Sequence, residues 1–490
     1  MQVYIAIDLG AGSGRLVAGV YDGSTLQLEE VHRFSNDGVE INGGCYWNTI
    51  GLFESIQEGL HKAAEKYGDA IVSVGTDTWG CDCALLDKQG NLLGGHRQYR
   101  DPRIEGMQEE MDARIPMEDV FASTGVQPAF YNTSLHLLAE SVKGNPCFDI
   151  ANRLLFTPDL LAYWLSGVQA NERSVTSTSQ LYNPMERDWA WNVIDALGLP
   201  RKMFGNIVSS GTVLGPLTDA VAEKAGISHD VKVVASAGHD TASAVAGLPM
   251  ERGGLWLSSG TWSILGVESE KPVVSAEALE AGLSNEGGVN KTTRLLHNVS
   301  GLWIIQECRR YWAEHGEEMS YAELARLAEE AQPHTAYIDP NDGVFATPGD
   351  MPQKIMDFCE RTGQVVPKSK GQLLRVATES LALKYRQVIE FLERGTGRTF
   401  DKLHAGGGGI QNELLAQATA DALGIPVVAG PVEATSCGNI ITQMVATGDL
   451  EDITAGRALV EASMDTFTYT PESSADWEEP YQKFLKLIEA

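Results

Sequence analysis

The sequence is poor in basic residues, since 37 Lys and Arg stand against 66 Asp and Glu and the net charge is −29. Such a surface repels nucleic-acid backbones and anionic lipids, so neither is expected as the main partner. No apolar run approaches the roughly 18 residues that a membrane span needs. Cysteine is scarce and odd in number, at seven, which favours reduced thiols in a cytoplasm. The opening MQVYIAIDLG is not typical of a signal peptide. The oligomeric state stays open.

Strand-like and helix-like stretches alternate along the 490 residues. Apolar runs typical of buried strands occupy 3–9, 70–77, 231–238 and 254–260. Amphipathic stretches typical of helices occupy 48–68 and 372–395. The alternation predicts an α/β protein with largely buried sheets, and the length predicts two to four domains at roughly 150 residues each.

The two halves of the chain repeat one plan, a strand followed by a glycine turn and a returning strand. In the first half this plan covers 3–23, with GAGSG at 10–14 as its turn. In the second half GLWLSSG at 254–260 leads into TWSILGVE at 261–268. We therefore expect two similar domains, 1–247 and 248–490, with a phosphate-holding turn from each at a central cleft.

The first turn, IDLGAGSGR at 7–15, is a candidate phosphate site. Consecutive small residues let backbone N–H groups approach an anion, and Ser13 and Arg15 add a hydroxyl and a charge. Asp8 ends the strand where it can orient a hydrated Mg²⁺. A dinucleotide fingerprint does not fit, because the glycine spacing differs and a strand follows. A simple hairpin turn is the alternative.

The segment VGTDTWGCDC at 74–83 joins a carboxylate, a hydroxyl, an indole and bare backbone at a strand end. This combination suits a polyol, although an ordinary strand end with a core Trp79 is the alternative. Cys81 and Cys83, two residues apart, are expected on a strand, as buried thiols rather than metal ligands, since no second Cys/His pair has zinc spacing.

The segment ASAGHDTASAVAG at 235–247 places Asp240 at the start of a helix after a strand. Asp240 is either a helix N-cap or a general base that takes a proton from a substrate hydroxyl. His239 is either a donor to a sugar oxygen or a structural group.

Two glycine segments of the second half complete the candidate set. LSSGTWSILG at 257–266 offers Thr261 as a phosphate or metal contact. In LHAGGGGIQNELLAQ at 403–417 a strand meets four glycines and then a helix, so a nucleotide can lie against bare backbone. Asn412 is either a helix cap or a nucleotide contact. No G-x-x-x-x-G-K-[ST] occurs, which excludes a P-loop enzyme.

These segments, in this order, resemble the FGGY carbohydrate kinases. TDTWG, YRDPR at 99–103, YNTSLHLLAE at 131–140, GHDTASAV, LSSGTWS, SNEGG at 284–288, HNVSGLWIIQE at 297–307 and GPVEATSCGNI at 430–440 carry the resemblance over nearly the whole chain. It implies a duplicated actin/hexokinase-type, ribonuclease H-like ATPase fold and ATP with Mg²⁺ as cosubstrate. It also implies an N-terminal domain on the sugar side and a C-terminal domain on the nucleotide side.

The resemblance further implies roles for single residues. Asp240 is similar to the family's proton acceptor for the O1 hydroxyl of a ketose. The implied sugar contacts are Gly80, His239, Thr241 and Asn298. The implied ATP contacts are Ala11, Gly12, Ser13, Gly14, Arg15, Thr261, Gln306 and one glycine of 406–409, for which we expect Gly409. Gly12 departs from the family pattern, and the glycine run is one residue longer than usual.

Three other functions are alternatives to a kinase that is specific for one ketose. The first is another ketose kinase of the same family. The second is an actin- or Hsp70-like ATPase acting on protein partners, which the HDT segment and the lack of an appended peptide-binding domain argue against. The third is a catalytically dead sugar sensor, which Asp240 and the two glycine turns argue against.

Overall fold

The computed structural model describes residues 1–489, which form two compact units. Unit 1 comprises 1–253, 268–295 and 434–464, and unit 2 comprises 254–267, 296–433 and 465–490. The last segment of unit 1 is thus contributed by a part of the chain that follows most of unit 2. Each unit is described by itself below.

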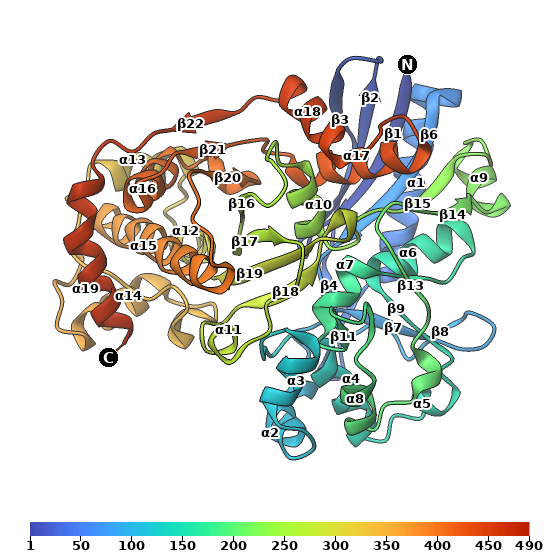
Figure 1. The fold of residues 1–490 in the computed structure, drawn as a ribbon, viewed down its shortest axis with the longest axis horizontal. Coiled ribbons are helices and arrows are strands. Elements are labelled where there is room, and N and C mark those ends of the chain that lie inside the picture. Colours follow the sequence, from blue (N-terminus) through green and yellow to red (C-terminus); the bar gives the residue numbers. More distant parts are fainter. Residues whose placement is uncertain (490) are drawn as a thin grey trace. The chain divides into compact units, whose positions relative to one another are not determined.

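Unit 1 is built on a six-stranded sheet, with helices packed on both of its faces (Figure 1). The strand order is β14-β15-β6-β1-β2-β3, in which β1 pairs antiparallel with β2 and parallel with β6. The strands are β1 (Gln2–Leu9), β2 (Ser13–Tyr21), β3 (Leu26–Ser35), β6 (Ile71–Thr78), β14 (Thr212–Pro216) and β15 (Lys232–Ala235). The covering helices are α1 (Thr49–Tyr67), α6 (Thr157–Ser166), α9 (Asp219–Ala225), α10 (Asp240–Gly247), α17 (Ala434–Thr447) and α18 (Ile453–Ser463).

The side-chain alternation of β1 decides which residues meet which helices. Val3, Ile5 and Ile7 share one core with apolar side chains of α1, α6 and α9. Tyr4 and Ala6 share the opposite core with α10, α17 and α18. Because side chains alternate along a strand, Asp8 is expected on the face of Tyr4 and Ala6, toward α17.

The helices α10 and α17 lie side by side although they are far apart in the sequence (Figure 1). Glycines permit this approach, because a Cβ on Gly438 would lie 1.7 Å from the carbonyl oxygen of Ser243. A Cβ on Gly247 would lie 2.1 Å from the carbonyl oxygen of Ala434. The orientation of α10, and with it the position of Asp240, is therefore fixed by a backbone-to-backbone contact.

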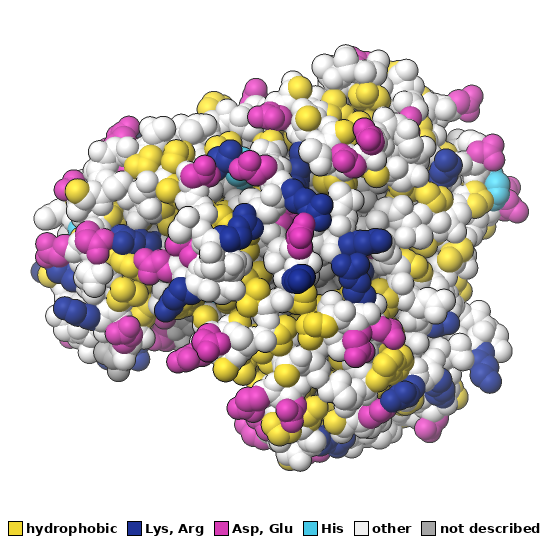
Figure 2. All heavy atoms as spheres, in the orientation of Figure 1, with side chains coloured by type: hydrophobic (Ala, Val, Ile, Leu, Met, Phe, Trp, Pro, Cys, Tyr) yellow, Lys and Arg dark blue, Asp and Glu magenta, His cyan; other side chains and the backbone are white. Residues whose placement is uncertain are grey.

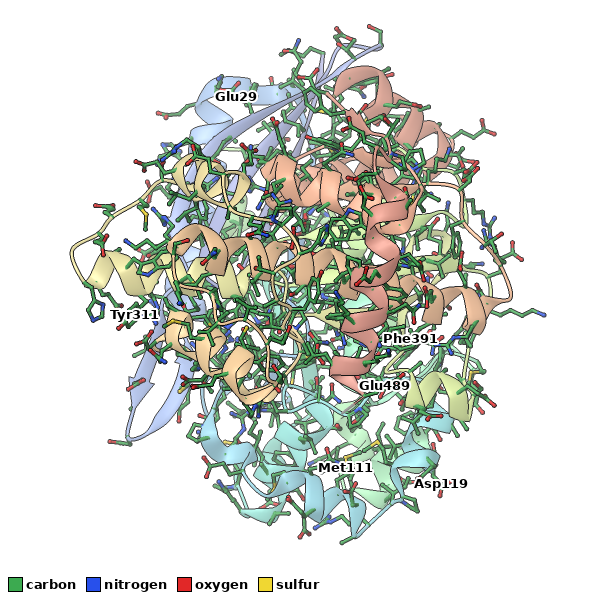
Figure 3. All side chains as sticks on the ribbon, turned by 90° about the vertical axis from the view of Figure 1, so that its left-hand side faces the viewer. Glu29, Met111, Asp119, Tyr311, Phe391 and Glu489 are labelled. Carbon is green, nitrogen blue, oxygen red and sulfur yellow. The ribbon has the colours of Figure 1, made fainter. Side chains whose placement is uncertain are left out.

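A peripheral lobe of unit 1 has a core of its own, in which Met111 is fully buried (labelled in Figure 3). The remaining strands of unit 1 are β4 (Gly38–Ile41), β5 (Gly44–Trp47), β7 (Cys83–Leu86), β8 (Leu92–Leu93), β9 (Arg153–Phe156), β10 (Asn171–Glu172), β11 (Tyr182–Asn183), β12 (Asp188–Trp189), β13 (Ile207–Val208) and β18 (Ser284–Gly287). Its other helices are α2 (Met107–Asp112), α3 (Met117–Thr124), α4 (Thr133–Val142), α5 (Cys147–Ile150), α7 (Arg173–Thr176), α8 (Trp191–Ala196) and α11 (Ala276–Glu280).

Unit 2 also contains six strands of a seven-stranded mixed sheet, in the order β19-β17-β16-β20-β21-β22. Its strands are β16 (Leu255–Ser259), β17 (Ser263–Ser269), β19 (Thr293–Val299), β20 (Leu403–Gly406), β21 (Val427–Ala429) and β22 (Phe467–Tyr469), and the chain passes between the units within β17 and β19. Its helices are α12 (Trp303–Glu314), α13 (Tyr321–Glu329), α14 (Met351–Arg361), α15 (Lys370–Thr396), α16 (Glu413–Leu423) and α19 (Glu478–Ile488).

The described residues provide no helix with both the length and the apolar character needed to cross a bilayer. Acidic side chains are scattered over the face of the molecule shown in Figure 2 rather than gathered in one patch.

Candidate functional site

Three carboxylates of unit 1 form the electrostatic centre of the candidate site. Asp8 and Asp77 are register partners on the parallel strands β1 and β6. Asp77 is fully buried and accepts a hydrogen bond from Asn439 of α17. Asp240 is the first residue of α10, and 34% of its side chain is exposed. It is thus the carboxylate of the three that a ligand reaches most easily.

The pKa values of this cluster reflect burial first and crowding of like charge second. Burial raises the pKa of Asp77 well above its ordinary value, and the negative charge of Asp8 adds to the rise. Burial also raises the pKa of Asp240, an effect that His239 opposes and Asp8 reinforces. Such a group of oxygens is a favourable environment for a cation.

The donor set fits Mg²⁺ only as a partner of a bound nucleotide. Carboxylate oxygens are suitable ligands, and Mg²⁺ is usually held by one or two of them together with phosphates and water. No group of three or more acidic, His or Cys side chains among residues 1–489 has the geometry of a self-sufficient metal site. Asp8 is already engaged, because its Oδ2 accepts hydrogen bonds from Arg15 at 2.8 Å and from Ser436 at 3.1 Å.

The first glycine turn is a hairpin between β1 and β2, with Ala11, Gly12 and Ser13 exposed. Gly10 N–H donates to the carbonyl of Ser13 at 2.8 Å, and Asn36 ties the turn to the end of β3. A Cβ on Gly12 would meet nothing within 4 Å, whereas a Cβ on Gly14 would lie 2.4 Å from the ring of Phe34. The backbone at Gly12 therefore faces open space, and Gly14 is required by packing. The returning strand after the turn is confirmed.

Arg15 points across the hairpin to Asp8, its register partner on β1. The sequence suggested that its guanidinium would fork onto phosphate oxygens. In the structure this guanidinium makes two hydrogen bonds to Asp8, at 2.8 and 3.1 Å. Its positive charge therefore offsets part of the negative charge of the carboxylate cluster.

His239, Asp240 and Thr241 follow β15 and lie beside the end of β6. An isolated bridge pairs Thr78 with His239, two residues before Gly80. The N-cap of α10 is His239, not Asp240, so the capping interpretation of Asp240 is wrong. The Oδ1 of Asp240 accepts hydrogen bonds from Thr241, at 2.5 Å from its N–H and 3.1 Å from its hydroxyl.

A pair of tryptophans lies directly beside Gly80. The indole N–H groups of Trp47 and Trp79 donate to one oxygen of buried Asp82, at 2.6 and 2.8 Å, and the rings are 4.2 Å apart. Burial raises the pKa of Asp82 to about 7, although the two indoles oppose the rise. Only Trp79 was singled out from the sequence, because Trp47 lies far from it along the chain and a single Asp in the same segment does not reveal the shared hydrogen bonds.

Cys81 is a correction to the predicted strand. Its φ of +71° places it in the left-handed region, so it lies in a turn between β6 and β7. Thr178 accepts the N–H of Cys81 at 2.9 Å, and the hydroxyl of Thr133 donates to its carbonyl. The backbone that carries Gly80 is thus held in a rarely populated conformation, which is common at ligand sites.

Unit 2 brings Thr261, Gln306 and Gly409 to the ends of β16 and β20. The hydroxyl of Thr261 donates to Gln306 Oε1 at 3.0 Å. The N–H groups of Leu302 and Trp303, at the start of α12, each donate at 3.1 Å to carbonyls of the second glycine turn. These bonds fix this turn to α12.

The glycine run lies between β20 and α16. A Cβ on Gly409 would lie 2.1 Å from Ser259 Oγ, whereas one on Gly408 would meet nothing within 4 Å. Asn412 is a helix cap, since its side chain accepts the N–H of Leu415. Asn298 lies on β19, where its carbonyl accepts a hydrogen bond from Asn341 at 3.1 Å.

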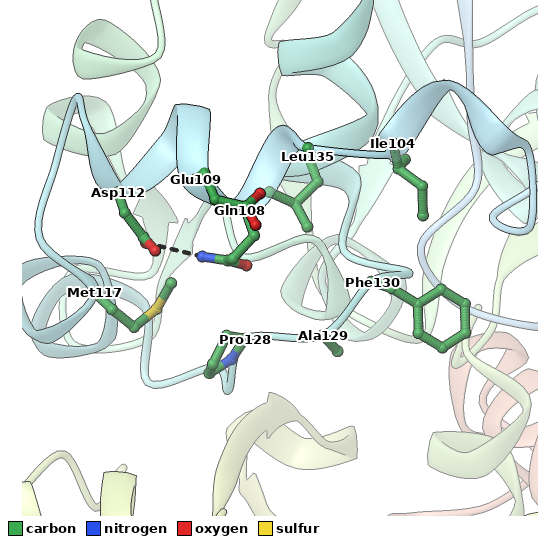
Figure 4. Close-up of a pocket in the computed structure, with 10 residues that line it drawn as sticks. Ile104, Gln108, Glu109, Asp112, Met117, Pro128, Ala129, Phe130 and Leu135 are labelled. Carbon is green, nitrogen blue, oxygen red and sulfur yellow. Dashed lines mark hydrogen bonds between the residues drawn. The ribbon is translucent and has the colours of Figure 1, made fainter. Parts of the chain in front are cut away.

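The pocket in Figure 4 is separate from these residues. It has a volume of about 470 Å³ and lies in the peripheral lobe of unit 1, between α2 and the segment that precedes α4. Met117, Phe130 and Leu135 give it an apolar lining, and Gln108 donates to Asp112 at its rim. None of the residues predicted to bind sugar or ATP lines it.

Two α/β units that carry a carboxylate cluster and glycine turns at strand ends define a phosphotransferase of the actin/hexokinase type. Solved structures share the fold: a xylulose kinase from Lactobacillus acidophilus aligns with a TM-score of 0.84 at 15% identity, covering 100% of this chain and 98% of that one. Glycerol kinase from Plasmodium falciparum, solved with ADP, aligns with a TM-score of 0.81 at 15% identity and the same coverage.

The chain belongs to the FGGY family of carbohydrate kinases. The family's N-terminal domain model matches residues 3–247, and its C-terminal domain model matches residues 255–447. A rhamnulokinase from Bacteroides thetaiotaomicron is 41% identical over 99% of both chains, and one from Oceanobacillus iheyensis is 36% identical over 96% of this chain and 98% of its own. The protein is thus an ATP-dependent sugar kinase, with Mg²⁺ as the metal usual for the family.

Proposed function

We propose that the protein is a rhamnulokinase, which transfers the γ-phosphoryl group of ATP to O1 of L-rhamnulose in L-rhamnose catabolism. The observation that carries this proposal is the identity of 36–41% to several rhamnulokinases over nearly the whole chain. ATP and a sugar from catabolism are both cytoplasmic metabolites, so we infer that the enzyme works in the cytoplasm.

Asp240 is the proposed proton acceptor. As sugar O1 attacks the γ-phosphorus, the O1–H bond breaks and its proton passes to a carboxylate oxygen of Asp240, while ADP leaves. The exposed fraction of Asp240 and its place at a strand end beside His239 support this role. We assign sugar contacts to Gly80, His239, Thr241 and Asn298.

The proposed ATP contacts are the first turn and the residues gathered in unit 2. Backbone N–H groups around Gly12 suit a phosphate, since nothing fills the space beside its Cα. The set comprises Ala11, Gly12, Ser13, Gly14, Arg15, Thr261, Gln306 and Gly409. Mg²⁺ bound with ATP offsets charge on the transferring group, and Asp8 is placed to hold it through water. We propose domains 1–247 and 248–490 for the sugar and nucleotide sides.

A coupled ADP-release assay tests the specificity. We expect L-rhamnulose to give the highest kcat/KM among rhamnulose, fuculose, xylulose, ribulose and glycerol. A preference for L-fuculose would assign the activity of an L-fuculokinase instead. ATP hydrolysis that no sugar stimulates would favour an ATPase acting on protein partners.

Asp240→Asn tests the base. Because Asn cannot accept the proton, we expect kcat to fall by about 10²–10⁴-fold. Calorimetry should find that ATP and sugar still bind, since the amide occupies the same space. A variant with full turnover would remove Asp240 from the mechanism.

A further inference from the structure

A buried group of three side chains reaches Asp240 from within unit 1. Glu286 on β18 and Arg294 on β19 are paired, with Arg294 Nη2 2.8 Å from Glu286 Oε2. The same Glu286 oxygen lies 3.1 Å from His239 Nδ1. On the other side of the imidazole ring, His239 Nε2 lies 3.5 Å from Asp240 Oδ1. The imidazole therefore has a carboxylate near each nitrogen, and Arg294 Nη2 also lies 3.1 Å from Nδ1.

The backbone of His239 is fixed without Glu286. The N–H of His239 donates to Ser174 Oγ at 3.1 Å, and the N–H of Gly238 donates to Glu172 Oε2 at 3.0 Å. These bonds place the Cα of His239 but leave the orientation of its ring open. Glu286 and Arg294 both contact Nδ1, so this pair decides which way the ring faces.

Arg294 keeps Glu286 charged in a buried place. Its side chain is fully buried, and its Nε donates to the carbonyl of Gly287 at 3.0 Å. Burial by itself would raise the pKa of Glu286, but Arg294 and His239 outweigh that effect and leave this pKa below its ordinary value. Glu286 therefore stays ionised and paired with Arg294 beside Nδ1 of the His239 ring.

We propose that Glu286, together with Arg294, is a positioning residue for phosphoryl transfer: the pair holds the His239 imidazole with Nε2 toward Asp240, so that Asp240 Oδ1 stays where it can accept the O1 proton. This inference rests on the proposed role of Asp240. The physical reason is that a partly exposed side chain such as Asp240 keeps one orientation only where the groups beside it are themselves fixed. The His239 ring is such a group, and Glu286 and Arg294 fix it at Nδ1.

Glu286→Gln tests the inference, because it keeps the size of the side chain but removes its charge. We expect kcat to fall on the order of 10- to 100-fold, part of the 10²–10⁴ that a positioned base contributes. The KM for ATP should stay close to wild type. Glu286→Asp, which keeps the charge on a shorter side chain, should recover part of the lost kcat.

Unit 2 offers a matched control. Glu379 on α15 is 1% exposed, lies 2.6 Å from Arg375 Nε and lies 3.7 Å from His334 Nδ1. Glu379→Gln therefore breaks an Arg–Glu–His group around another buried glutamate, in unit 2. We expect both Gln variants to lose thermal stability but only Glu286→Gln to lose kcat. An equal loss of kcat in the two variants would overturn the inference.

The double variant Glu286→Gln/His239→Asn shows whether Glu286 acts through His239. If it does, kcat of the double variant equals that of His239→Asn alone; losses that multiply would reject the inference. If Glu286→Gln does not fold, Glu286→Asp alone and combined with His239→Asn serves for the same comparison. Wild type that phosphorylates no ketose removes the proposed function. If wild type is active, Asp240→Asn is inactive and Glu286→Gln is fully active, only the role of Glu286 is rejected.

Discussion

The buried carboxyl group of Asp82 makes the free energy of unfolding depend on pH, and the substitution Asp82→Asn removes this contribution. Its carboxyl group is 3% exposed and accepts the indole N–H groups of Trp47 and Trp79. Asp82→Asn keeps an oxygen for both indoles but removes the titration. The amide NH₂ then faces the backbone N–H of Tyr99, which donates to Asp82. That mismatch costs a free energy that does not change with pH.

The direction and size of the pH effect on the free energy of unfolding follow from the pKa of Asp82, which burial raises from 3.8 to about 7. Between these values the folded protein keeps the proton and the unfolded chain loses it, so stability falls as pH rises. At about 1.4 kcal/mol per pH unit, Asp82 costs wild type about 3 kcal/mol between pH 5 and pH 8. The variant escapes this cost, so its free energy of unfolding gains by that amount relative to wild type.

Urea unfolding followed by tryptophan fluorescence at pH 5, 6, 7 and 8 measures the difference between the two proteins. Asp188→Asn is a suitable control, because exposed Asp188 also accepts an indole N–H, from Trp191 at 3.3 Å. Replacing it should leave the pH dependence close to that of wild type. Parallel curves for wild type and Asp82→Asn over this range would refute the reasoning.

Two further predictions concern glycines. Gly12→Ala should leave the Tm unchanged, because its Cβ meets nothing, but it should raise the KM for ATP on the order of tenfold, or about 1.4 kcal/mol. Its matched control, Gly14→Ala, should lower the Tm, because its Cβ would clash with the ring of Phe34. The reverse pattern would contradict both assignments. Gly438→Ala should destabilise unit 1 by about 1–3 kcal/mol or more in urea unfolding, since its Cβ would overlap the carbonyl of Ser243. It should also lower kcat by shifting α10, and wild-type kcat would separate α10 from catalysis.

Much of the fold could be predicted because buried elements leave strong local signals. The apolar run 3–9 corresponds to β1, 70–77 to β6 within one residue, and the amphipathic stretch 372–395 lies inside α15. The turn at Cys81 was missed because a left-handed cysteine has no sequence signature. Its conformation depends on Thr133 and Thr178, which are distant in the sequence.

Only part of the candidate site could be predicted, because the rest depends on contacts between residues that are distant in the sequence. Asp240 could be found because it follows a strand and begins a helix, which is a local pattern. The pairing of Arg15 with Asp8 depends on hairpin register, which places the two opposite each other only if the turn has its observed length. No local pattern links Glu286 or Arg294 to His239, since β18 and β19 follow α10 by tens of residues.

The charges in unit 1 explain why distant residues are needed at this site. The carboxylate that takes the proton of a sugar hydroxyl has to be ionised. The negative charge of Asp8 makes ionisation of Asp240 less favourable, and Asp240 in turn raises the pKa of Asp77. The hairpin register places the cation Arg15 beside Asp8, whereas Asp240 interacts with its neighbour His239 and with the charge of Arg294. Fixing the His239 ring beside Asp240 requires groups on the far side of the ring, which Glu286 and Arg294 supply. The buried Glu286 in turn requires the charge of Arg294, since an unpaired buried carboxylate is costly.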